Sequence, residues 1–133
     1  MTFTTFSLDP RINEAIQRAG FTTPTPIQEN AIPAVLEGSD LLGIAQTGTG
    51  KTAAFILPIL QKLMQNRSRR VRALVLAPTR ELAEQIHQDC RKLGSATGIK
   101  SVPIYGGVSK NPQKTAIRKG AEIVIACPGR LLD

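Results

Sequence analysis

The clearest chemical signal in the sequence is a glycine-rich stretch, AQTGTGKT, at residues 45–52. Glycines allow a loop to curl so that successive backbone N–H groups point at phosphate oxygens. In such a loop Lys51 would reach the β- and γ-phosphates of a nucleotide, and the Thr52 hydroxyl would hold Mg²⁺. The alternative is a glycine-rich turn that contains Lys-Thr by chance. The adjacency of Gly50, Lys51 and Thr52 favours the nucleotide site.

The loop lies between a short apolar run and a helical pattern, and this arrangement recurs along the chain. Buried strands are predicted at residues 41–45, 73–77, 102–105 and 123–126, and helices between them at 51–64, 81–93 and 111–120, with a further helix starting at Pro128-Gly129. This alternation predicts an α/β fold in three layers, a parallel sheet with helices on both faces. Ligands of such sheets bind beyond the carboxyl ends of the strands, where the motifs of this chain lie.

Prolines and capping residues predict where several helices begin and end. Asp9-Pro10 is an N-cap followed by a proline at the first helical position. Thr25-Pro26 opens a second helix, which Pro33 should kink or break. Asn111-Pro112 should cap the helix that follows the third predicted strand.

The chain is strongly basic. Its 133 residues include 17 Lys and Arg against 10 Asp and Glu, which gives a formal net charge of +7. This balance suits a polyanionic partner, nucleic acid before membrane, although a domain that is merely basic fits the charge equally well. The arginines at 67–72 are interpreted as part of a solvated loop rather than as a nucleic-acid grip.

Neither a metal centre nor a membrane segment is indicated. Cys90 and Cys127 lie far apart and fit no metal-ligand spacing. No apolar run reaches the ~18 residues that a membrane span needs, and the opening residues do not resemble a signal peptide. We therefore expect a cytoplasmic protein with reduced thiols and no contact with a membrane.

Further motifs follow one another in order: GFTTPTPIQ at residues 20–28, PTRELA at 78–83, Gly106-Gly107 and CPGR at 127–130. These stretches resemble the Q motif, motif Ia, the GG element and motif Ib of the DEAD-box family of ATP-dependent RNA helicases. The loop, which opens with alanine, is similar to the family's form of the P-loop. The resemblance covers the whole chain. It implies that residues 1–133 form the N-terminal part of the first RecA-like domain, and the short N-terminus suggests a bacterial member.

The resemblance implies ATP and Mg²⁺ as cofactors, with Lys51 and Thr52 taking part in catalysis. The implied nucleotide contacts are Phe3, Phe21, Thr25, Gln28, Gln46, Thr47, Gly48, Thr49, Gly50, Lys51 and Thr52. In the family, the residue at Gln28 reads the adenine edge, for which a carboxamide supplies one donor and one acceptor. On the residues alone, a capping box of Thr25 and Gln28 is the favoured interpretation. Phe3, at the place of the family's upstream aromatic, would give the base an apolar face or make only a core contact.

The resemblance also implies RNA as a partner, bound without regard to sequence. The implied contacts are Thr79, Arg80, Gly106, Gly107, Cys127, Gly129 and Arg130. Arg80 and Arg130 are placed at helix starts, where free N–H groups and a guanidinium can grip phosphates together. Without the resemblance, Thr79 and Arg80 could equally cap and solvate a helix. Cys127 stands where the family usually has threonine, and a thiol is the weaker donor.

The resemblance places the family's Asp-Glu-Ala-Asp motif, its Ser-Ala-Thr motif and its second RecA-like domain beyond Asp133. We therefore expect the chain alone to bind nucleotide and part of the RNA without hydrolysing ATP, whereas the whole enzyme is an ATP hydrolase and helicase. In the family fold the strand before the phosphate loop pairs with a strand outside this stretch. An open sheet edge and self-association are therefore expected of the chain alone. Two other classes remain: a small-molecule kinase or GTPase, which would not carry the Q motif, and a non-catalytic P-loop nucleotide-binding module.

Overall fold

A small parallel sheet brings the motifs of the sequence together. The computed structural model describes residues 2–131. Its strands are β1 (Ala73–Leu76), β2 (Ser101–Ile104) and β3 (Ile123–Ala126), and they lie in the order β1-β3-β2. Both pairings with β3 are parallel. The carboxyl ends of the strands therefore meet at one edge of the sheet, as the alternating pattern predicted.

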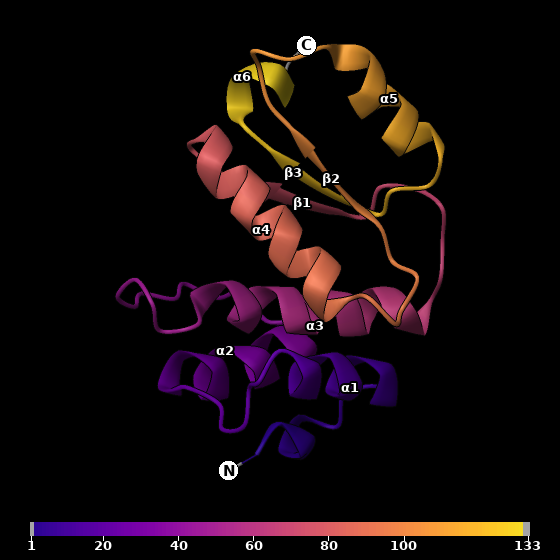
Figure 1. The fold of residues 1–133 in the computed structure, drawn as a ribbon. Coiled ribbons are helices and arrows are strands. Elements are labelled where there is room, and N and C mark those ends of the chain that lie inside the picture. Colours follow the sequence, from indigo (N-terminus) through magenta and orange to yellow (C-terminus); the bar gives the residue numbers. More distant parts are fainter. Residues whose placement is uncertain (1, 132–133) are drawn as a thin grey trace.

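Helices cover the sheet on both faces (Figure 1), which confirms the predicted three-layer α/β fold. They are the 3-10 turn η1 (Phe3–Phe6) and the α-helices α1 (Pro10–Arg18), α2 (Pro26–Leu36), α3 (Lys51–Gln65), α4 (Arg80–Leu93), α5 (Lys110–Arg118) and α6 (Pro128–Leu131). Figure 1 shows α4 across one face of the sheet, α5 on the other, and α3 lying between α4 and the pair α1 and α2. Within residues 2–131, no helix combines the length and apolar character that a bilayer crossing requires.

The central strand β3 is buried on both faces. Ile123 and Ile125 are fully buried in the larger core, together with side chains of α1 to α4. Val124 and Ala126 point the other way, into a smaller cluster that α5 completes. A strand enclosed by helices on both sides needs apolar residues at every position, and this run of four meets that need.

The strand predicted at residues 41–45 is wrong for this structure. Residues 39–46 have no regular secondary structure, and the side chains of Leu42 and Ile44 are each 86% exposed. A strand forms only where a neighbouring strand takes up its backbone hydrogen bonds. In the described part of the chain, β3 already has a neighbour on each side. The free edge of β1 is not paired with the apolar run either, so the run stays exposed.

Two predictions about helix ends need correction. α2 continues through Pro33 to Leu36, so the proline does not break the helix, and a kink there stays a prediction. Its missing N–H removes one bond of the helical ladder, and the packing of α2 against α3 holds the helix together. The N-cap of α5 is Ser109, whose side chain accepts a hydrogen bond from the N–H of Asn111, and not Asn111 itself.

A buried carboxylate anchors the basic loop before β1. Glu122 is 2% exposed, and its two oxygens lie 3.3 Å from Arg67 and 3.1 Å from Arg72. Arg67 also donates to the carbonyl of Thr97, and Arg72 to that of Leu63. Two of the four arginines of this loop are therefore structural, which the interpretation as a solvated loop missed.

Candidate functional site

The phosphate loop turns from the exposed apolar segment into α3. Gly48 and Gly50 adopt left-handed conformations with φ of 86° and 82°, which residues with a side chain rarely adopt. Between them, the Thr49 hydroxyl donates to the Gln46 carbonyl at 2.6 Å and closes the turn. Gly50 is the N-cap of α3, so Lys51 and Thr52 stand in the first helical turn. N–H groups at that position have no partner within the helix and are available to an anion.

Gln28 joins the start of α2 to this loop. Its Oε1 accepts the backbone N–H of Thr25 at 3.0 Å, which is the Gln28 half of the expected capping box. Its Nε2 donates to the Gly50 carbonyl at 3.2 Å, across 22 positions of sequence. The side chain is 3% exposed. The cap interaction of Gln28 with Thr25 is therefore present, in a side chain that also contacts the phosphate loop, and the reading of an adenine edge by Gln28 stays a prediction.

The close approach of Gln28 explains why residue 50 is glycine. A Cβ atom at this position would overlap the Gln28 amide nitrogen and lie 3.4 Å from the Thr25 hydroxyl. At Gly48, by contrast, a Cβ would meet no atom within 4 Å. Gly48 is therefore required only by the backbone conformation, whereas Gly50 is required by both the conformation and the contact with Gln28.

The aromatic residues expected near the base have unequal exposure. Phe3 is 5% exposed and belongs to the core, where it meets Phe6 edge-on with ring centroids 6.0 Å apart. Phe21 stacks on Phe3 at 6.3 Å and is 38% exposed. Of the two interpretations of Phe3, the structure shows the core contact. Phe21 is the ring that remains open to a ligand.

A second group of predicted residues lies where the strands end. Thr79 is the N-cap of α4, and its hydroxyl accepts the N–H of Leu82 at 3.2 Å. The Arg80 guanidinium carbon lies 5.1 Å from the centroid of the Tyr105 ring. A Cβ on Gly107, where φ is 84°, would lie 2.9 Å from Arg80 Nη1. The glycine therefore lets this guanidinium lie directly against the turn after β2.

Arg130 approaches the same turn from α6. Its Nη1 donates to the Val108 carbonyl at 3.2 Å, and its Nη2 lies 3.9 Å from the position of a Cβ on Gly106. The N–H of Cys127 donates to the Ile104 carbonyl at 2.8 Å, so this backbone group continues the sheet. Gly129 is exposed, with open space where a side chain would be. Residues from three strand ends thus converge, with two guanidinium groups flanking Gly106-Gly107.

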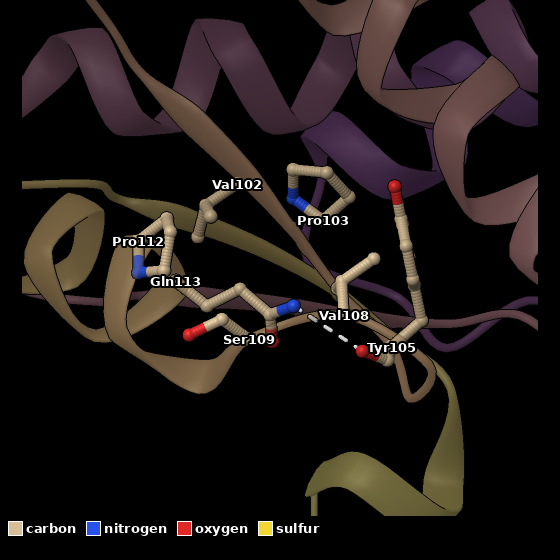
Figure 2. Close-up of a pocket in the computed structure, with 7 residues that line it drawn as sticks. All are labelled: Val102, Pro103, Tyr105, Val108, Ser109, Pro112 and Gln113. Atoms are coloured by element: carbon tan, nitrogen blue, oxygen red, sulfur yellow. Dashed lines mark hydrogen bonds between the residues drawn. The ribbon is translucent and has the colours of Figure 1, made fainter.

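Sequence reasoning missed Tyr105 and Gln113, which support this turn. A cavity of about 340 Å³ lies beside β2. The residues that line it are drawn in Figure 2: Val102, Pro103, Tyr105, Val108, Ser109, Pro112 and Gln113. Gln113 is 9% exposed, and its Nε2 donates to the Tyr105 carbonyl at 3.2 Å. The one signal available was the position of the chain's single tyrosine directly before the glycine pair. Burial, and a hydrogen bond to Glu84, raise the pKa of Tyr105.

The lone histidine and Cys90 belong to the packing of α4. His87 is half-buried, with Nδ1 2.8 Å from the Ser101 hydroxyl. Burial lowers the pKa of His87. Cys90 packs beneath the helix, and burial raises the pKa of its thiol to about 12. That thiol is therefore inert at neutral pH.

Comparison with known proteins identifies the family of this chain. The family model described as DEAD/DEAH box helicase matches residues 25–133. The "DEAD-box ATP-dependent RNA helicase RhpA" of Helicobacter pylori (strain B128) is 51% identical over 132 residues, which are 99% of this chain and 26% of the relative. The "ATP-dependent rRNA helicase RRP3" of Meyerozyma guilliermondii is 50% identical, over 99% of this chain and 28% of the relative. The chain thus spans about a quarter of the length of the curated relatives it matches.

Solved structures show the same fold. A DEAD box protein from Methanococcus jannaschii superposes with a TM-score of 0.92 at 39% identity, over the whole of this chain and 36% of the other. The RNA helicase Prp28 from Chaetomium thermophilum, solved bound to ADP, superposes with a TM-score of 0.89 at 46% identity, over 99% of this chain and 33% of the other. The parallel sheet and its helices are therefore those of the RecA-like domain of these proteins.

Proposed function

The chain belongs to the DEAD-box family of RNA helicases, and from this premise we propose that it is the N-terminal part of the first RecA-like domain of an ATP-dependent RNA helicase. Such an enzyme couples ATP binding and hydrolysis to the remodelling of RNA. Residues 1–133 contribute the nucleotide-binding loop and part of the RNA-binding surface. The names of the matched relatives, and the match along nearly the whole chain, support this proposal.

The observation that carries the nucleotide proposal is the hydrogen bond from Gln28 to the Gly50 carbonyl. It holds the residue proposed to read the base against the loop proposed to hold the phosphates. A carboxamide offers two N–H donors and an oxygen with two lone pairs. One donor and one lone pair are used here, so one of each remains for the adenine edge. The ADP bound to the related Prp28 structure agrees with this choice of ligand.

Lys51 and Thr52 act on the phosphates in this proposal. Lys51 is exposed in the first turn of α3, where its ammonium group neutralises charge on the β- and γ-phosphates. The described residues contain no group of three or more His, Cys, Asp or Glu that could hold a metal alone. Mg²⁺ is held in nucleotide sites by substrate phosphates and one or two protein oxygens, and the Thr52 hydroxyl is proposed as the protein oxygen here.

The Phe21 ring, rather than the Phe3 ring, is proposed to pack against the face of the adenine base. The exposed ring of Phe21 stacks on Phe3, which is buried, so Phe3 supports the contact from below. Backbone N–H groups in the turn at Gln46, Thr47, Gly48 and Thr49 surround the phosphates. Thr25 contributes by orienting Gln28 through its N–H.

Arg80, Arg130 and the turn at Gly106-Gly107 form the proposed RNA grip. Two guanidinium groups beside a turn without side chains suit a sugar-phosphate backbone, which can approach closely there. The N–H groups that follow Thr79 at the start of α4, and that of Gly129 at the start of α6, add further donors, whereas the N–H of Cys127 is bonded to Ile104. Contacts of this kind carry no base information, so RNA binding is independent of sequence.

In this proposal, the hydrolysis of ATP requires groups outside residues 1–133. The sequence contains no Asp-Glu-Ala-Asp stretch, so we assign the carboxylates that activate water, and the arginines that stabilise the transition state, to the rest of this domain and a second RecA-like domain. The same regions are proposed to cover the exposed edge of β1 and the apolar run at 41–45. When the chain is alone, a second copy takes their place. Two free cysteines agree with a cytoplasmic location.

Calorimetric titration of the full-length protein with ADP and GDP tests the nucleotide proposal. ADP is expected to bind more tightly, and Gln28→Ala should narrow the gap, because a bidentate pair is worth ~1–3 kcal/mol of discrimination. Gln65→Ala, at an exposed glutamine at the far end of α3, is the matched control and should leave the gap unchanged. Equal affinity for the two nucleotides in the unmodified protein would sink the proposal.

A further inference from the structure

Tyr105 separates two oppositely charged side chains that stand one helical turn apart on α4. Its ring lies beneath Arg80, with 5.1 Å between the guanidinium carbon and the ring centroid. Its hydroxyl donates to Glu84 Oε2 at 3.2 Å. The other oxygen of this carboxylate, Oε1, accepts a hydrogen bond from Gln88 at 3.1 Å. Both oxygens of Glu84 are therefore engaged by neutral donors.

An ion pair between Arg80 and Glu84 would be the ordinary outcome of this spacing. Side chains at positions i and i+4 of a helix are neighbours, and opposite charges at that spacing attract each other. Even so, no salt bridge within residues 2–131 includes either of these two side chains. Tyr105 contacts both side chains instead. Its ring face makes a cation–π contact with Arg80, and its hydroxyl donates a hydrogen bond to Glu84.

The position of Tyr105 is itself secured from the other side of β2. Figure 2 shows the ring extending away from Gln113, while the Tyr105 carbonyl oxygen accepts the hydrogen bond from Gln113 Nε2. Gly107, two residues later, lets Arg80 Nη1 lie close to the turn. The guanidinium is thus held between an aromatic face and a backbone that carries no side chain.

From these contacts we propose that Tyr105 is a positioning residue for Arg80, which keeps the guanidinium away from Glu84 and available to an RNA phosphate. The proposal deepens the RNA grip described above and rests on it. A cation–π contact uses the face of the guanidinium, so the N–H groups on its edge remain free for a phosphate. An ion pair with Glu84 would consume those same N–H groups and cancel the charge.

Affinity for a single-stranded RNA of mixed sequence, measured on the full-length protein, gives the first test. Tyr105→Phe keeps the ring but releases Glu84, and RNA affinity should fall about twofold, the size of one helical ion pair. Tyr105→Leu also removes the aromatic face, and the fall should reach about fivefold. Adding Glu84→Gln to Tyr105→Phe should restore the affinity, because no carboxylate is left to capture Arg80. A role of Tyr105 in folding alone would not be rescued in this way.

Arg80→Gln separates this inference from the proposed function. If Arg80 contacts RNA, this variant binds RNA more weakly, whereas Arg91→Gln, at the far end of the same helix, is the matched control with the same loss of charge. On the Arg80→Gln background, Tyr105→Phe should cause no further loss. A further loss of RNA affinity on that background overturns the role of Tyr105. The same conclusion follows if Arg80→Gln weakens RNA binding but Tyr105→Phe alone does not.

The Arg80 side-chain resonance, observed by NMR without RNA, tests the geometry even if Arg80 proves not to contact RNA. In the unmodified protein its Nε–H signal should show the ring-current shift of a group above an aromatic face. Tyr105→Phe should reduce that shift as Arg80 turns to Glu84, and Tyr105→Phe with Glu84→Gln should regain it. An unchanged signal in Tyr105→Phe refutes the inference. If instead the signal behaves as expected but Arg80→Gln binds RNA normally, the proposed RNA grip fails and Tyr105 is only an organiser of α4.

Discussion

Replacing Gly50 by alanine should separate two reasons for a glycine in the phosphate loop. At Gly50 the new methyl group meets both a left-handed backbone, with φ of 82°, and the Gln28 amide nitrogen. At Gly48, where φ is 86°, it meets only the backbone requirement, because no atom lies within 4 Å of the added carbon. Gly48→Ala is therefore the matched control for the strain of the conformation.

The expected magnitudes follow from these contacts. A residue with a Cβ in the left-handed region costs about 1–2 kcal/mol, and this cost applies to both variants. Gly50→Ala also displaces Gln28 from the Gly50 carbonyl and disturbs its bond to Thr25, and each lost hydrogen bond costs about 1 kcal/mol. Gly50→Ala should therefore lower the free energy of local opening by about 1–2 kcal/mol more than Gly48→Ala does.

Hydrogen exchange, read by mass spectrometry on peptides from α2 and the start of α3, measures this local free energy in the full-length protein. Protection in both peptides should fall in Gly50→Ala, but only in the α3 peptide in Gly48→Ala. The double variant Gln28→Ala with Gly50→Ala should lose less free energy of local opening than the two single variants together, because the alanine methyl group at position 50 then has room. Equal effects of Gly48→Ala and Gly50→Ala on the α2 peptide would refute the link between Gln28 and the loop.

Further consequences of the structure can be checked in the same protein. Lys51→Ala should abolish ATP turnover in a phosphate-release assay while leaving RNA affinity within about twofold, because phosphate charge and RNA grip are held by different residues; normal turnover would rule out the role of Lys51. Glu122→Gln should lower the free energy of unfolding, measured by urea titration, by about 2 kcal/mol, because a buried carboxylate between two arginines is lost. Burial lowers the pKa of His87 in the folded protein. The free energy of unfolding should therefore fall as the pH drops from about 6.5, because the unfolded chain takes up the proton first, until the lowered pKa of the folded state is passed. His87→Asn should remove that slope, and an unchanged slope would contradict the assignment.

Local signals in the sequence were sufficient for most of the secondary structure. The run at Ile123–Ala126 is apolar at every position and forms the inner strand where it was predicted. Asp9 and Thr79 stand before helix starts, and their side chains accept N–H groups of the first turn. Glycines, prolines and capping residues act within a few positions of themselves, so their effects can be predicted without knowing the rest of the fold.

Pairing between distant segments could not be read from the sequence, and there the predictions failed. The apolar run at 41–45 has the composition of a buried strand, but a strand also needs a partner, and the described residues provide none. α2 passes through Pro33 because its packing against α3 outweighs the local preference of proline.

The same limit applies to the functional groups. The order of the motifs indicated the nucleotide loop and the likeness to helicases, and the parallel sheet then brought Arg80, Arg130 and the glycine pair to one place. Only the folded chain shows that Gln28 is bonded to Gly50, or that Tyr105 stands between Arg80 and Glu84. Residue types along a chain determine which interactions are available. The tertiary structure decides which of the competing partners each side chain meets, because distance between side chains is a property of the fold.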